Sequence, residues 1–339
     1  MKKALLVLIL LIQCSIYPQF NFNLQITNGD FDARNPFIYK DEYAFHPRIF
    51  FELHNNDYSN IYSVQYNLDN YSFEDTIAVT TGNYQNLNPQ FKPSKGLIYQ
   101  TNKNGNWDIV FIPNSSGAWE QPMYLANSNE DETLPEFLES AYVAWNTDSL
   151  NILYRKNNDI EFLTYKQNQI NNEIVFEQTQ ELSYTEFVGL ELEDWGVNSG
   201  YYAFAIEADN NQNKKIVKRF KPYNGNWQEK IVLLDNCNCS GLTVQLTDYV
   251  NWSLIYSDTV QSEKKLFIIE DVIYANPTVN QLPISHTGQL SDFDSYVTLI
   301  VGKSAEGKPE NIELYQPHTY LVEQNGVTKV RCSKWDFGF

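Results

Sequence analysis

Positively charged residues are scarce in this 339-residue chain, which has 24 Lys and Arg against 42 Asp and Glu and a formal net charge of −18. Binding to nucleic acid needs basic side chains that neutralise phosphates, so this charge balance argues against such a partner. After residue 20, no apolar run approaches the ~20 residues of a membrane-spanning helix. We therefore expect a mature chain with an acidic, solvated surface and no transmembrane helix.

Residue types and motifs typical of catalysis are also few. The four histidines, His46, His54, His286 and His318, lie far apart and lack the spacing of a metal site. The sequence contains no Gly-x-Ser-x-Gly elbow, no Walker loop and no dinucleotide fingerprint. We therefore predict no catalytic residues and no cofactor, while a site assembled from residues distant in the sequence stays open.

Cysteine is rare, with four residues. Cys14 lies in a leader segment, which leaves the odd number of Cys237, Cys239 and Cys332 in the mature chain. Cys237 and Cys239 are separated by one residue, which is not the Cys-x-x-Cys spacing of redox or zinc sites. We expect these two to be turn cysteines, either inert or bridged to each other.

Residues 1–20 have the features of a signal peptide. Lys2 and Lys3 form a basic start, and residues 4–12 form an apolar run of secretory length. The sequence therefore predicts an exported protein, periplasmic or extracellular. The segment that ends at Cys14 also resembles a bacterial lipobox, although Gln13 is a poor residue before the cysteine, so a lipid anchor at Cys14 is the alternative.

Aromatic residues are abundant, at 15% of the chain, and favour strands over helices. The clearest pattern covers residues 88–111. It begins with Pro89 and Phe91, continues with an apolar strand around 97–99, and passes through an Asn/Gly turn at 105–106 into a second strand. Weaker copies of this pattern recur along the chain, which is typical of a repeat architecture.

Six copies of the unit can be traced. Residues 30–339 divided among six units give 310/6, or about 52 residues each, which is the length expected for a propeller blade. The first apolar strands of the units are expected at 49–52, 97–99, 142–145, 201–206, 252–256 and 297–301. We predict an all-β, six-bladed β-propeller in a single domain over residues 21–339, with five or seven blades as alternatives.

A ring of blades must also close. Residues 22–27 alternate apolar and polar side chains, as a half-buried strand does. We expect this segment to join the last blade as its outer strand, because that pairing would remove an open sheet edge.

The second unit resembles the WD40-like (PD40) repeat of the TolB β-propeller family. The matching residues are Pro89, Phe91, Lys92, Pro93, Ser94, Lys95 and Gly96, followed by 105–109. Lys92 stands where Ser is usual, and Lys95 where Asp is common. The resemblance implies an exported scaffold that binds a protein or ligand. In this repeat, Pro sets the backbone that leads into the strand, the aromatic packs between blades, and Asp108 is expected to accept hydrogen bonds from backbone amides.

Two segments depart from the repeat and are the candidate sites. The first is acidic and aromatic, a combination common at sugar sites, and consists of Glu191, Glu193, Asp194 and Trp195. The second alternates oxygen-bearing residues as a calcium loop does, with Asp209, Asn211 and Asn213, but lacks the Gly and distal Glu of such a loop. We therefore predict that the second segment is a hairpin tip without metal, with calcium binding as the alternative.

The function that we predict is an exported, non-enzymatic, monomeric propeller that binds an envelope or extracellular protein or a glycan through its blade loops and central channel. The alternative is a glycoside-active enzyme that uses two facing carboxylates, with Asp292 and Asp294 as further candidates beside Asp194. A third alternative is that the propeller is one part of a larger secreted protein.

Overall fold

The computed structural model describes most of the chain between Asn23 and Asp336, and the described part consists of strands and turns without an α-helix. In that part, no helix is long and apolar enough to cross a membrane. The described residues are 23–25, 32–39, 48–55, 57–67, 72–74, 76–92, 95–114, 118–140, 149–192, 199–248, 251–260, 263–274, 277–281, 300–301, 314–324 and 327–336.

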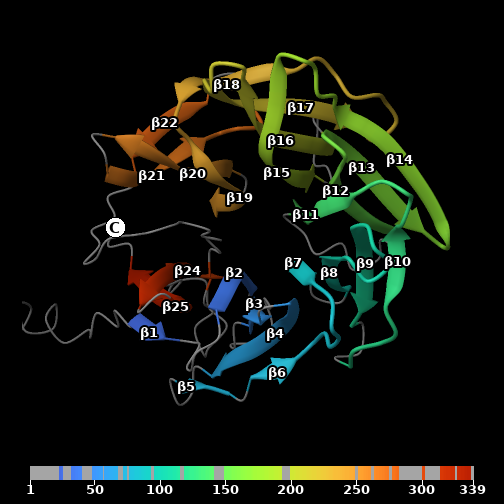
Figure 1. Ribbon diagram of the computed structural model, residues 1–339. Helices are drawn as coiled ribbons and strands as arrows, with labels where there is room; N and C mark the ends of the chain where they lie inside the picture. The colour runs from blue at the N-terminus through green and yellow to red at the C-terminus, as the bar shows by residue number, and fades with distance from the viewer. Residues whose placement is uncertain are drawn as a thin grey trace, which may run out of the picture.

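The described residues form 25 strands in five sheets (Figure 1). The first sheet contains β2 (Asp32–Tyr39), β3 (Arg48–Asn55), β4 (Tyr58–Asn67), β5 (Ser72–Phe73) and β6 (Ile77–Ala78). The second contains β7 (Asn86–Lys92), β8 (Gly96–Thr101), β9 (Asp108–Pro113) and β10 (Met123–Ala126). The fourth contains β19 (Ser240–Asp248), β20 (Asn251–Val260), β21 (Glu263–Glu270) and β22 (Thr278–Gln281).

The third sheet has eight strands and joins two antiparallel groups through one parallel contact. Its first group is β11 (Glu132–Ser140), β12 (Ser149–Lys156), β13 (Asp159–Lys166) and β14 (Gln169–Phe176). Its second group is β15 (Leu182–Leu192), β16 (Gly200–Asp209), β17 (Lys214–Pro222) and β18 (Ile231–Cys237). The strands β11 and β15 pair in parallel, with Leu138 opposite Gly189 and Ser140 opposite Glu191.

The fifth sheet brings together the first and the last described strands of the chain. It contains β23 (Ile300–Val301), β24 (Leu314–Gln324), β25 (Val327–Asp336) and β1 (Asn23–Gln25). β1 pairs antiparallel with β25 at the edge of this sheet, where Leu24 lies opposite Cys332. The prediction that the segment 22–27 joins the last sheet as its outer strand is therefore confirmed for the residues of β1.

Most of the predicted strands are present. The segments 49–52, 97–99, 201–206 and 252–256 lie in β3, β8, β16 and β20. Residues 142–145 lie outside the described residues, and of 297–301 only the two residues of β23 lie inside them.

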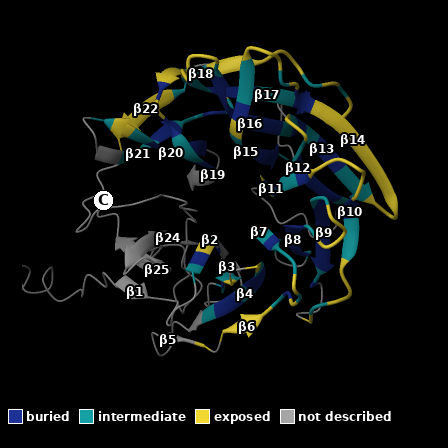
Figure 2. Cartoon of the chain, in the orientation of Figure 1, coloured by how far each residue is buried: buried dark blue, intermediate teal, exposed yellow. Residues whose placement is uncertain are grey.

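The sheets are arranged in a ring, with β2, β7, β11, β15 and β19 nearest its centre (Figure 1). The core lies between neighbouring sheets, and the middle strands are its most buried part (Figure 2). In β8, Leu97 and Tyr99 pack with Phe50 of the first sheet, whereas Ile98 packs with Phe137 of the third. Because adjacent strand residues point to opposite faces, both faces of the second sheet are buried, which explains the continuous apolar run of β8.

The aromatic position of the repeat has the expected role. Phe91 of β7 stacks on Phe50 of β3, with ring centroids 4.8 Å apart and an interplanar angle of 28°. The ring of Trp119 meets the Phe50 ring edge-on, at 6.2 Å. Such pairs add about 0.5–1.5 kcal/mol to the burial of the rings. The aromatic residue of the motif therefore fixes the contact between the first and second sheets.

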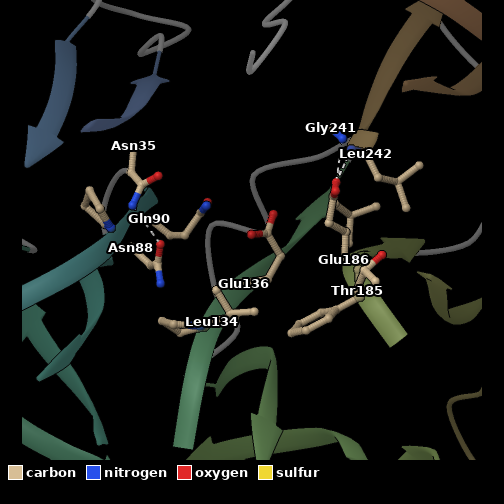
Figure 3. Close-up of a pocket in the computed structure, with 13 residues that line it drawn as sticks. Asn35, Asn88, Gln90, Leu134, Glu136, Thr185, Glu186, Gly241 and Leu242 are labelled. Atoms are coloured by element: carbon tan, nitrogen blue, oxygen red, sulfur yellow. Dashed lines mark hydrogen bonds between the residues drawn. The ribbon is translucent and has the colours of Figure 1, made fainter. Parts of the chain in front are cut away.

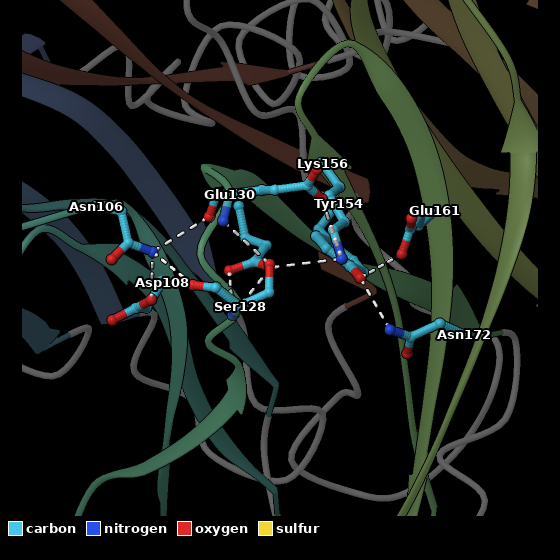
Figure 4. A network of polar contacts seen from close by, with 9 residues as sticks. Asn106, Asp108, Ser128, Glu130, Tyr154, Lys156, Glu161 and Asn172 are labelled. Atoms are coloured by element: carbon cyan, nitrogen blue, oxygen red, sulfur yellow. Dashed lines mark hydrogen bonds and ion pairs between the residues drawn. The ribbon is translucent and has the colours of Figure 1, made fainter. Parts of the chain in front are cut away.

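The turn around Asp108 differs from the prediction in its donors (Figure 4). The buried carboxylate of Asp108 accepts hydrogen bonds from the side-chain amides of Asn104, at 2.9 Å, and Asn106, at 3.0 Å, rather than from backbone amides. Asn106 also donates to the carbonyl groups of Ser128 and Glu130. The turn is thus tied to the loop that leads into β11, and its carboxylate serves the scaffold.

Candidate functional site

Each of the five strands nearest the centre is interrupted by a β-bulge. The antiparallel register shifts between Arg34 and Phe37 in β2, and at the corresponding places in β7, β11, β15 and β19. Four of these bulges contain a residue with positive φ, namely Asn35 (44°), Asn88 (54°), Leu134 (52°) and Gly241 (69°). A bulge bends its strand and redirects side chains, so these strands are shaped alike at one level of the ring.

The repeated proline lies in these bulges. Pro36, Pro89 and Pro135 each follow a residue with positive φ inside a strand, not in a loop that leads into one. Proline has no N–H to donate, and it is tolerated where the ladder of hydrogen bonds is already broken. The Asn/Leu-Pro signature of the sequence therefore marks the bulge.

A cavity of about 230 Å³ lies at the level of the bulges (Figure 3). All five inner strands contribute to its wall, which combines amides, carboxyl groups, a hydroxyl and apolar surface. The lining residues are Asn35, Asn88, Pro89, Gln90, Leu134, Pro135, Glu136, Thr185, Glu186, Phe187, Val188, Gly241 and Leu242.

The first part of the wall is held by a buried carboxylate. Glu52 of β3 has no exposed surface, and its Oε1 accepts hydrogen bonds from Asn35 Nδ2 and from the backbone N–H of Asn88, both at 2.6 Å. Its Oε2 lies 2.6 Å from His54 Nε2. Asn35 Nδ2 also donates to Asn88 Oδ1, at 3.1 Å. One carboxylate of the first sheet therefore fixes the bulges of both β2 and β7.

The same arrangement recurs between the second and third sheets. The buried side chain of Gln100 in β8 accepts from Asn88 Nδ2 and from the backbone N–H of Leu134, both at 2.7 Å. In the third sheet, Arg155 of β12 donates to the carbonyl oxygen of Tyr184, at 2.6 Å, beside the bulge of β15. A polar side chain of one group of strands thus binds the bulged backbone of the next.

A second carboxyl group of the wall binds the bulge of β19. Glu186 Oε2 accepts from the backbone N–H groups of Gly241, at 2.6 Å, and Leu242, at 2.9 Å (Figure 3). Two adjacent N–H groups that converge on one oxygen form a strong, charge-assisted contact. Glu186 therefore has a structural task at the cavity wall.

Glu136 is placed differently. Its side chain projects from β11 into the cavity, between Gln90 and Glu186 (Figure 3). Desolvation raises the pKa of Glu136 well above its ordinary value, and repulsion from Glu139 adds to this effect. Desolvation also raises the pKa of Glu139, and the ammonium group of Lys92 opposes that shift. Lys92 Nζ donates to the carbonyl oxygen of Leu138, at 2.8 Å.

The predicted acidic and aromatic site is only partly described. Glu191 lies near the end of β15, an inner strand, where its buried carboxyl group accepts from Asn151 Nδ2 at 3.1 Å. Glu193, Asp194 and Trp195 lie outside the described residues, as do Asp292 and Asp294. The described member is therefore on a cavity-lining strand but does not line the cavity.

The predicted calcium loop is a hairpin tip between β16 and β17. Asp209 Oδ1 accepts from the backbone N–H groups of Asn211, at 2.8 Å, and Asn213, at 2.9 Å, and Asp209 Oδ2 accepts from Asn213 Nδ2 at 3.0 Å. These hydrogen bonds lower the pKa of Asp209. Within the described residues, no group of three or more His, Cys, Asp and Glu could hold a metal ion.

The cysteine pair is bridged. Cys237 and Cys239 form a disulfide across one intervening residue, and both side chains are buried in the core between the third and fourth sheets. Of the two arrangements expected, the local bridge is the one present.

Comparisons with known proteins identify the fold. The sequence matches no protein-family model and no curated protein. Its structure is similar to that of Trypanosoma rangeli sialidase in complex with sialic acid, with a TM-score of 0.53 and 10% identity over 93% of this chain and 56% of that one. It is also similar to AofleA from Arthrobotrys oligospora, with a TM-score of 0.52 and 11% identity over 91% of this chain and 90% of that one. The chain is thus an all-β protein with a β-propeller fold.

Proposed function

We propose that this chain is a glycan-binding β-propeller whose ligand enters the cavity at the bulges of the inner strands. The observation that carries the proposal is the composition of that wall. Hydrogen-bonding groups of Gln90, Thr185 and Glu136 face the same space as the apolar side chains of Leu134 and Phe187. Sugars present hydroxyl groups and apolar C–H faces together, and a wall that alternates both kinds of surface complements them.

The volume of the cavity and the charge of its lining residues limit which sugars it can bind. A cavity of about 230 Å³ is smaller than the ~300–1,000 Å³ typical of pockets for drug-sized ligands, so it suits a single sugar unit. Among its described lining residues there are two carboxyl groups and no Lys or Arg. An anionic sugar would meet repulsion here. The sialidase likeness therefore supports the fold but not sialic acid as the ligand.

We further propose the architecture and location around this site. Six groups of strands, closed by β1, are the natural division of the five sheets into blades, since the eight-stranded sheet contains two four-stranded groups. The motif at 88–111 favours membership of the TolB-like repeat family. The disulfide of Cys237 and Cys239 fits an oxidising compartment and so supports export; we propose separately that the chain is a monomer.

The test is binding of neutral and amino monosaccharides, and then of a glycan array, to the purified mature chain. Thr185→Trp places an indole in the cavity, because Thr185 is exposed at its wall, and should abolish binding. Thr179→Trp makes the same change at an exposed position outside the wall and should leave binding intact. Equal affinities of the two variants for every ligand that binds would overturn the proposal.

A glycoside hydrolase is the second candidate, favoured by one observation. Glu136 has a raised pKa and shares its cavity with a second carboxyl group, that of Glu186. A protonated carboxyl group beside a second one is the combination that glycoside hydrolysis requires. A screen of aryl-glycosides and polysaccharides decides between the candidates, because Glu136→Gln would abolish turnover by an enzyme while a pure binding protein shows no turnover at all.

A further inference from the structure

Within the cavity wall, the carboxyl group of Glu136 is the one that lacks a partner. In the described part of the chain it takes part in no hydrogen bond and no ion pair, although it projects into the space that a ligand would occupy (Figure 3). Glu186, by contrast, binds the N–H groups of Gly241 and Leu242. The side chain of Glu136 is partly exposed, so a ligand that enters the cavity can reach its carboxyl group.

We propose that Glu136 is the counter-ion for an ammonium group on the ligand, so that the cavity selects amino sugars over neutral sugars. This inference rests on the glycan-binding function proposed above and names the class of sugar. It assigns to Glu136 a direct contact with the ligand.

The charges around Glu136 support a cation. From its own strand, Glu139 repels it. From the neighbouring strand β7, Lys92 acts on Glu139 and donates to the carbonyl oxygen of Leu138, and it is not among the groups that lower the pKa of Glu136. From β15, the other neighbour, comes the carboxyl group of Glu186. No cation of the described wall competes for Glu136, so an incoming ammonium group would be the first to pair with it.

The energetics favour the same ligand. Burying two charges together is often unprofitable, because both must leave water. Here the fold has already removed part of the hydration of the carboxyl group, so binding adds mainly the desolvation of the ammonium group and the release of the proton that the raised pKa of Glu136 favours. In return, the ion pair forms in a medium of lower effective dielectric than water, and it offsets the repulsion between Glu136 and Glu139.

Calorimetric titration with three related sugars tests the inference. Glucosamine carries an ammonium group where glucose carries a hydroxyl group, and N-acetylglucosamine carries a neutral amide there. We expect glucosamine to bind about ten-fold more tightly than either neutral sugar, a difference of ~1.4 kcal/mol. Glu136→Gln should remove this preference, because it should lower the affinity for glucosamine to the level of that for glucose. Glu139→Gln is the control on the same strand: Glu139 repels Glu136 but does not line the cavity, so this variant should keep most of the preference.

The outcomes separate this inference from the proposed function. Equal binding of all three sugars by the unmodified chain would overturn the inference and leave glycan binding standing. Binding of n-butylamine as tight as that of glucosamine, with no binding of glucose, would support the ammonium site and overturn sugar recognition. If neither the sugars nor n-butylamine binds, both proposals are wrong. A preference for glucosamine that persists in Glu136→Gln would also overturn the assignment to Glu136.

Discussion

The turn around Asp108 and the cavity wall each contain a carboxyl group, but the two groups differ in their hydrogen-bond partners. At the turn, the Asp108 carboxylate is satisfied by the amides of Asn104 and Asn106, both within four residues of it. In the cavity, the Glu136 carboxyl group has no such partner among the described residues and projects into open space. A carboxyl group that its own turn satisfies is part of the scaffold, whereas one that lines a cavity and has no partner among the described residues is a candidate for ligand contact.

The cavity wall also differs from the turn in where its hydrogen-bond partners come from. The polar side chains at the wall bind the backbone of a neighbouring sheet, whereas both amides that bind Asp108 come from its own hairpin. Glu52 of the first sheet holds the backbone of Asn88 in the second, and Gln100 of the second holds the backbone of Leu134 in the third. The residues in these contacts are 36 and 34 positions apart in the sequence. The inner wall therefore depends on the assembled ring, whereas the Asp108 carboxylate is satisfied within its own hairpin, which Asn106 also ties to the loop that leads into β11.

The largest effect is expected when a contact between sheets is removed. Glu52→Ala would leave the N–H of Asn88 without its acceptor, remove one of the two acceptors of the Asn35 amide, and remove the partner of His54 Nε2. At ~1–3 kcal/mol for each orphaned donor, and with the side chain fully buried, we expect a loss of about 3–5 kcal/mol in the free energy of unfolding. Urea denaturation measures this loss. Glu52→Gln keeps an acceptor oxygen and should lose less, and a loss below about 1 kcal/mol in Glu52→Ala would show that the contact does not hold the sheets together.

A smaller effect is expected at the turn. Asp108→Ala removes the acceptor of two side-chain amides inside one hairpin, at a cost of about 1–3 kcal/mol. Sugar affinity should not change, because the turn contributes no residue to the cavity wall. Thermal unfolding of this variant measures the loss of stability, and calorimetric titration of the same variant measures its sugar affinity. A loss of affinity without a loss of stability would reverse the contrast between the two regions.

The sequence predicted the ring better than the site. The pattern at 88–111 identified the strands, and the segment 22–27 predicted the closure that β1 and β25 make. The Leu134-Pro135 signature marks the bulge beside Glu136, but the sequence does not show which side chains that bulge directs into a cavity, because the cavity forms only when five strands from different sheets meet. The acidic segment at 191–195 pointed to an inner strand, but its described residue Glu191 binds Asn151 instead of lining the cavity.

The pH dependence of stability tests whether the pKa of Glu136 is raised in the folded state. A carboxyl group with a raised folded-state pKa keeps more protons in the folded than in the unfolded state, so its contribution is fully present below its ordinary pKa and is lost as pH rises through the folded-state value. Glu136→Gln should therefore melt at a higher temperature than the unmodified chain at pH 8 and show no such gain near pH 4. The change should be smaller than for Asp108→Ala, since water reaches this partly exposed side chain. A rise in the melting temperature of Glu136→Gln that is the same at pH 4 and pH 8 would contradict a raised pKa of Glu136.

The smallest effect is expected at the hairpin tip of Asp209, which tests the same distinction at the surface. Both carboxylate oxygens already accept hydrogen bonds from Asn211 and Asn213, so a cation would have to displace donors that the turn itself provides. The tip is exposed to water, which screens the charge of the Asp209 carboxylate. We expect millimolar calcium to leave the melting temperature unchanged in both the unmodified chain and Asp209→Asn. A calcium-dependent rise in the melting temperature that Asp209→Asn abolishes would make this turn a metal site. Hydrogen bonds within a turn would then no longer distinguish a structural carboxylate from a functional one.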